Sequence, residues 1–246
     1  MHHVLECVFP ENQPLPDAAS VEKRTAGALD DAIVSHATWL NSPAWTTERA
    51  NLLREAQMIA QSWGVFLRKA DATILHNEIE LEGDFGGLLI AGRADSLLKL
   101  PDGRVLVVDH KRSKSHARRE RMTKGWDLQV ALYRAMLEHP SEETPVTPLL
   151  QEGAQTITAY HTMLDATVLT DFGGRSIAGA EAAPVDISSN ATDHLLEVLS
   201  EVGAGVIRLN RSDDISVMEK ERGITPYALK DNEFVKAFTL PAEEAS

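Results

Sequence analysis

Two carboxylates and a lysine are spaced in this chain in a way that suits the hydrolysis of phosphodiester bonds. Asp95 ends a Gly-Arg-Ala-Asp segment, and Asp109 and Lys111 flank His110 after an apolar run. Carboxylate oxygens, helped by the backbone carbonyl of His110, are the hard ligands that Mg2+ prefers. A lysine beside them can orient or deprotonate the attacking water and stabilise charge on phosphate oxygens. An Asp-x-Lys triplet by itself is more often a solvated strand end, so the interpretation depends on the residues around it.

A predicted hairpin brings these residues together. Residues 88–100 and 105–108 are apolar and β-prone, and the Pro-Asp-Gly-Arg segment between them is typical of a turn. Because neighbouring strands lie side by side, Asp95 on the first strand and Asp109 at the end of the second can converge at one edge of a sheet. Side chains alternate along a strand, so Lys111 lies on the same face as Asp109.

A helix is predicted after the hairpin, from about Leu128 to Glu138, and a His-Pro pair ends it. Gln129 and Tyr133 are four residues apart, so they share one face of this helix and can both point at the site. The alternative is that Tyr133 packs in the core and Gln129 is a surface residue.

In combination, the Gly-Arg-x-Asp, Asp-x-Lys and Gln-x-x-x-Tyr segments resemble the PD-(D/E)XK nuclease superfamily, in the branch that includes the nuclease domains of RecB and AddB. The resemblance covers roughly residues 76–135. It implies an α/β, restriction-endonuclease-like core, with a mixed central sheet of about four or five strands and helices on both faces. It also implies a site in which each motif residue has a role. Asp95, Asp109 and the His110 carbonyl would hold Mg2+ or Mn2+, Lys111 would be catalytic, and Gln129 and Tyr133 would bind the DNA backbone and hold Lys111 or its water.

The resemblance further implies a histidine or glutamate, on a helix before the sheet, that completes the metal site. His36 lies on the apolar face of a predicted helix together with Ile33, so it is a candidate ligand. It lies nine residues after Gly27, whereas the family pattern Gly-x-x-x-His requires four. A core histidine with a satisfied hydrogen bond explains the pattern equally well. On the predicted first strand, Glu78 or Glu80 either supports the metal or is simply solvated.

A basic run follows the Asp-x-Lys segment, although the whole chain has a formal net charge of −13. Screening at physiological salt confines electrostatic effects to about 8 Å, so local charge outweighs net charge. We expect this run to form a flexible polar loop that binds the phosphate backbone. The alternative is a solvated loop with no partner. The predicted nucleic-acid-binding residues are Arg112, Lys114, Arg118, Arg119, Arg121 and Lys124.

The chain is predicted to be a single domain over residues 1–246. Its expected parts are an irregular lead-in (1–19), N-terminal helices (20–70), a catalytic core (73–138), and the remaining strands and C-terminal helices (155–246). No run of about 18 apolar residues predicts a membrane span, and the first residues do not resemble a signal peptide, so we expect a cytoplasmic protein. The single Cys7 cannot supply the four-cysteine iron–sulfur site that some relatives carry.

The function hypothesis is a deoxyribonuclease, with an exonuclease as the preferred form, that depends on Mg2+ or Mn2+. It would act in DNA recombination or repair or in phage-related DNA processing. The sequence carries no helicase motif, so a helicase or recombination subunit would be a separate partner. Two alternatives stay open. One is a catalytically silent, nuclease-like DNA-binding or scaffold subunit of a helicase–nuclease complex, and the other is a soluble domain with no nucleic-acid role.

Overall fold

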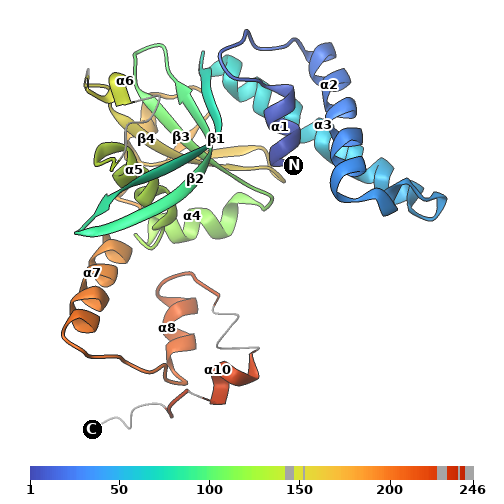
Figure 1. Cartoon of the computed structure of the whole chain (residues 1–246). Helices are drawn as coiled ribbons and strands as arrows, with labels where there is room; N and C mark the ends of the chain where they lie inside the picture. Colours follow the sequence, from blue (N-terminus) through green and yellow to red (C-terminus); the bar gives the residue numbers. More distant parts are fainter. Residues whose placement is uncertain (142–146, 152, 226–231, 238, 242–246) are drawn as a thin grey trace.

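A six-stranded mixed sheet forms the centre of the part of the chain that the computed structural model describes, residues 1–141, 147–151, 153–225, 232–237 and 239–241. The strands lie in sequence order (Figure 1): β1 (Thr73–Phe85), β2 (Leu88–Lys99), β3 (Val105–Lys111), β4 (Thr156–Thr162), β5 (Thr167–Thr170) and β6 (Glu181–Ala182). The pairs β3–β4 and β5–β6 are parallel, and the other neighbours are antiparallel. The predicted hairpin over residues 88–108 is therefore confirmed as β2 and β3.

Helices cover both faces of this sheet. Three N-terminal helices, α1 (His2–Val8), α2 (Ala18–His36) and α3 (Thr46–Lys69), pack on one face around Trp63, Leu106 and Val108. Two further helices, α4 (Ser115–Thr123) and α5 (Gln129–Glu138), pack on the other face against Val105 and Val107. Alternate residues of β3 thus enter two separate cores, which explains why the whole strand is apolar up to Asp109. The α/β fold with helices on both faces is as predicted.

The remaining elements are short or C-terminal. They are η1 (Thr38–Asn41), η2 (Pro43–Trp45), α6 (Thr147–Gln151), η3 (Phe172–Ser176), α7 (Ser189–Gly203), α8 (Asp214–Lys220) and α10 (Glu233–Ala237). Among the helices formed by described residues, none is both long and apolar enough to cross a membrane.

Two predictions about local structure are wrong. Residues 1–19 are not an irregular lead-in throughout, because residues 2–8 form α1, which buries Val4, Leu5 and Val8, and α2 already begins at Ala18. The basic run is not a loop, because residues 115–123 form α4. Its arginines, glutamate and methionine favour helix, Met122 is buried in the second core, and the backbone N–H and hydroxyl of Ser115 donate to Asp165 at 2.8 and 2.7 Å.

Candidate active site

The structure brings four of the predicted site residues together at the end of β3. The Lys111 Nζ lies 2.8 Å from Oδ2 of Asp109. The Gln129 amide donates to Oδ1 of Asp109 at 2.8 Å and to the Tyr133 hydroxyl at 3.2 Å. The Tyr133 hydroxyl in turn donates to the backbone carbonyl of Arg93 at 2.8 Å. The first turns of α5 therefore hold the carboxylate of β3 from one side while Lys111 contacts it from the other.

Asp109 is only 2 % exposed, which makes its charge costly. Burial raises the pKa of Asp109, the nearby charge of Asp95 raises it further, and Lys111 acts in the opposite direction. Oδ2 of Asp109 is buried and faces the Lys111 ammonium at 2.8 Å, with no further donor among the described residues. A buried carboxylate oxygen that no backbone or amide donor holds is a suitable ligand for a cation.

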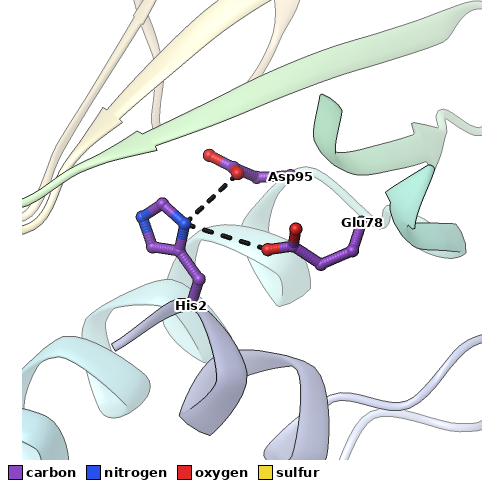
Figure 2. A group of neighbouring side chains, drawn as sticks. All are labelled: His2, Glu78 and Asp95. Carbon is purple, nitrogen blue, oxygen red and sulfur yellow. Dashed lines mark ion pairs between the residues drawn. The ribbon is translucent and has the colours of Figure 1, made fainter. Parts of the chain in front are cut away.

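Asp95 links the two strands of the hairpin. Its Oδ2 accepts a hydrogen bond from the backbone N–H of His110 at 2.5 Å. Its Oδ1 lies 3.2 Å from Nδ1 of His2, which α1 presents to the sheet (Figure 2). The hydrogen bond that the Asp95 carboxylate accepts from His2 raises the pKa of His2, while burial opposes this change.

Glu78 completes a group of three side chains that could together hold a metal ion, His2, Glu78 and Asp95, whose potential ligand atoms lie within 4.8 Å of one another (Figure 2). Glu78 lies opposite Asp95 on β1, since its flanking residues pair with those that flank Asp95. Its φ of 51° is unusual for a residue with a side chain in a strand, and such backbone conformations concentrate at functional sites. Glu80, the alternative on the same strand, is exposed.

His36 is not part of this group. It is exposed in the last turn of α2, beyond Ile33, the last buried residue of that helix, so the prediction that it faces inward is wrong. The histidine that an N-terminal helix brings to the site is His2. The signal that could have identified it is the spacing of Val4, Leu5 and Val8, which marks a short amphipathic helix directly after His2.

A buried histidine pair lies beneath the site on the opposite face of the sheet. Nδ1 of His110 lies 2.9 Å from Nδ1 of His161, and Nε2 of His110 lies 3.2 Å from the Ser96 hydroxyl. The Trp63 ring stacks on His161 at 4.7 Å between centroids. Burial lowers the pKa of His161 to about 3 and that of His110 well below its usual range. Both rings are therefore neutral near pH 7, so one can donate its N–H to the other. Nothing in the sequence indicated this pair.

The predicted basic strip consists largely of ion pairs. Arg112 binds Glu55 with N···O distances of 2.6 and 2.9 Å, and the other three pairs are Arg118–Asp127 at 2.9 Å, Arg119–Glu181 at 2.6 Å and Lys124–Glu120 at 2.7 Å. Lys114 is exposed, and Nε of Arg121 is buried without a hydrogen bond to any described residue. Most of these cations thus have an acidic neighbour already, and a phosphate would have to compete with it.

The comparison with protein families agrees with this geometry. The family model described as the PD-(D/E)XK nuclease superfamily matches residues 1–219, a longer stretch than the motif-bearing segment of the sequence. No curated protein matches the chain significantly. With the Asp-x-Lys pair on one strand, the aspartate of the preceding strand beside it and a family match over most of its length, the chain belongs to the PD-(D/E)XK nuclease superfamily.

Proposed function

We propose that this protein is a metal-dependent deoxyribonuclease of the RecB/AddB-like type, and that it acts as an exonuclease. The observation that carries the proposal is the buried Asp109 carboxylate, which is in contact with Lys111, bonded to Gln129 and beside Asp95. A buried carboxylate against a lysine is expensive for a purely structural role, because removing charges from water costs several kcal/mol per ion. Family membership supplies the phosphodiester chemistry that makes this arrangement useful.

The residues present fit a divalent cation. Asp95 and Asp109 offer carboxylate oxygens, Oδ2 of Asp109 has no donor beside it other than the Lys111 ammonium among the described residues, and His2 and Glu78 lie beside Asp95. The chemistry that a bound divalent cation supplies is polarisation of a phosphate oxygen and activation of water. We propose Mg2+ or Mn2+, since an imidazole ligand favours tolerance of Mn2+. The His110 carbonyl remains a proposed ligand.

The protein groups have separate tasks in this mechanism. The Lys111 ammonium orients the attacking water and stabilises negative charge on the phosphate. Gln129 and Tyr133 keep the Asp109 carboxylate in one orientation, because their hydrogen bonds run from α5 to the end of β3 and on to the Arg93 carbonyl. A role in DNA recombination, repair or phage-related processing and a cytoplasmic location belong to the same proposal.

Digestion of end-labelled single- and double-stranded DNA tests the function. We expect cleavage with Mg2+ or Mn2+, none in EDTA, and a loss of about 100-fold or more in Lys111→Ala, because a positioned charge of this kind is worth that much. The matched control is Lys99→Ala, which removes an exposed lysine at the far end of the same hairpin. Cleavage by Lys111→Ala at the unmutated rate, or none by the unmutated chain with any ion, would instead support the silent DNA-binding module.

A further inference from the structure

Arg118 differs from the other cations of the basic strip in how it is paired. The glutamates that bind Arg112, Arg119 and Lys124 have side chains that are 23–57 % exposed. Nη1 of Arg118 instead donates, at 2.9 Å, to Oδ2 of Asp127, whose side chain is 1 % exposed. The Arg118 side chain is itself only 16 % exposed. A charge pair removed from water in this way costs desolvation that a surface pair does not.

Three segments fix the Arg118 guanidinium in place. The guanidinium carbon lies 4.2 Å above the centroid of the Tyr160 ring on β4. The Tyr160 hydroxyl donates to Oδ1 of Asp127, so both oxygens of that carboxylate are occupied. The backbone N–H of Asp127 donates to the carbonyl of Ile187 at 2.8 Å. Burial and the charge of Asp127 raise the pKa of Tyr160 well above its usual range, so the hydroxyl stays a donor.

This guanidinium lies beside the candidate active site. Tyr160 is the register partner of Asp109 in the parallel pair β3–β4, and residues in register on neighbouring strands point to the same face of the sheet. The charge of Arg118 is close enough to act on the Asp109 carboxylate, although its effect is smaller than those of Lys111 and Asp95. Asp127 also begins the segment that leads into α5, two residues before Gln129, which binds Asp109. The same carboxylate therefore holds Arg118 and anchors the start of the helix that holds Asp109.

The Arg118 guanidinium keeps donors for a ligand. An arginine has five N–H donors in a planar fork that matches the oxygens of phosphate. Among the described residues, Asp127 is the only hydrogen-bond partner of the Arg118 guanidinium, through Nη1. We propose that Arg118 binds a non-bridging oxygen of the scissile phosphate, and that Asp127 and Tyr160 are positioning residues that hold its guanidinium in the binding orientation. This assignment rests on the proposed nuclease function and separates Arg118 from the rest of the basic strip.

The first test compares Arg118→Gln with Arg104→Gln in single-turnover cleavage by the full chain. Arg104 is a matched control, because its side chain is 18 % exposed, it pairs with Asp102, and it lies before β3, at the opposite end of that strand from Lys111. We expect Arg118→Gln to lower the rate constant about 100-fold or more, as loss of a charge-stabilising donor does, and Arg118→Lys to recover part of it. Arg104→Gln should stay within about twofold. Equal losses in the two glutamine variants would overturn the assignment.

A phosphorothioate substrate distinguishes a direct contact between Arg118 and the phosphate from a purely structural role of Arg118. Sulfur at the non-bridging oxygen that Arg118 contacts should slow the unmutated enzyme, and that effect should shrink in Arg118→Gln. In Asp127→Asn and Tyr160→Phe, kcat should fall with little change in KM. If Asp127→Asn does not fold, Tyr160→Phe, which removes only one hydroxyl, tests whether this pair positions the Arg118 guanidinium. A thio effect of the same size in Arg118→Gln and the unmutated enzyme would count against the contact.

A binding measurement keeps this inference separate from the proposed function. Fluorescence anisotropy of a labelled DNA oligonucleotide is followed against salt concentration in the Lys111→Ala background with EDTA present, where no cleavage is expected. Adding Arg118→Gln should weaken binding and reduce the salt slope by about one, whereas adding Arg104→Gln should change neither. If the unmutated chain cleaves no DNA, the proposed function fails, and the anisotropy comparison still decides whether Arg118 binds phosphate. Unchanged affinity in Arg118→Gln would refute its role.

Discussion

Burying the Asp109 carboxylate lowers the stability of the fold, but it provides a charged group at the candidate active site. Its carboxylate is buried, its pKa is raised by that burial, and Lys111 is the cation in direct contact with it. Such a group lowers the stability of the folded state at neutral pH, because the folded protein favours its protonated form. The proposed function gives a reason for keeping it, since Asp109 and Lys111 form the candidate Asp-x-Lys pair of the site.

At the residue scale, His2 and His36 give opposite expectations for metal binding. We expect His2→Gln to weaken Mn2+ binding by at least about 10-fold and His36→Gln to leave it unchanged, because only His2 lies with Glu78 and Asp95. The free Mn2+ signal in electron paramagnetic resonance measures the affinity. Because Asp95 raises the pKa of His2 and a ligand must be deprotonated, affinity should rise as pH passes above about 6.5. Equal affinities for the two variants would remove His2 from the site.

At the scale of elements, the site depends on the contact between α3, β3 and β4 beneath it. Trp63 of α3 packs against both His110 of β3 and His161 of β4. The Ser96 hydroxyl extends this network to β2, and from there it donates to Asn77 of β1 at 3.1 Å. These hydrogen bonds tie four neighbouring strands together directly below Asp95 and Asp109, so they fix the separation of the strands that carry the carboxylates.

The buried histidines of this hydrogen-bond network make the free energy of unfolding depend on pH. The folded pKa of His161 is depressed to about 3 from 6.5, so below pH ~6.5 the unfolded chain binds a proton that the folded chain does not. The free energy of unfolding should therefore fall as pH falls through this range, by up to about 1.4 kcal/mol per pH unit for each such histidine. Urea unfolding at several pH values measures it. His161→Phe should be less stable at pH 7 by about 1–3 kcal/mol and show a shallower slope.

The control for that measurement is His36→Asn, which changes an exposed histidine on α2. Its slope with pH should match that of the unmutated protein. If His161→Phe also kept the full slope, the acid sensitivity would have to come from other groups, and the neutral histidine pair would not be its source.

At the scale of the whole molecule, net charge and the arrangement of cations both oppose tight DNA binding by the chain alone. The chain has a formal charge of −13, and four of the six predicted DNA-binding cations already form ion pairs with acidic side chains. A negative protein is repelled by a polyanion unless a local field or a partner overcomes the repulsion. This balance suits a nuclease that receives its substrate from another protein.

A helicase or recombination subunit is the partner that we propose. Sedimentation velocity of the labelled chain, alone and mixed with candidate helicases, should show a faster species in at least one mixture. DNA cleavage should increase in the same mixture, because the partner raises the local concentration of single strand at the site. A monomer in every mixture, with unchanged cleavage, would mean that the chain works without such a subunit.

Local sequence signals were sufficient for the motif-bearing hairpin and the helix that follows it. Apolar, β-prone runs, the Pro-Asp-Gly turn and the His-Pro stop depend on neighbouring residues, so β2, β3 and α5 were predictable within a few residues. The basic run was not, because helix α4 depends on burial of Met122 and on Asp165, which lies 50 residues after Ser115. The ion pairs Arg112–Glu55 and Arg119–Glu181 were equally inaccessible, since their members are 57 and 62 residues apart.

By itself, the sequence determined the order of the candidate site residues along the chain: Asp95, then Asp109 and Lys111 at the end of one strand, then Gln129 and Tyr133 on one helix face. These relations follow from the periods of strand and helix, which are local. Only the tertiary structure decided that His2, not His36, reaches Asp95, that Glu78 faces both, and that Asp127 ties Arg118 to β4. Such contacts join segments that are far apart in the chain, and they exist only once the two cores have packed α1, α4 and α5 against the sheet.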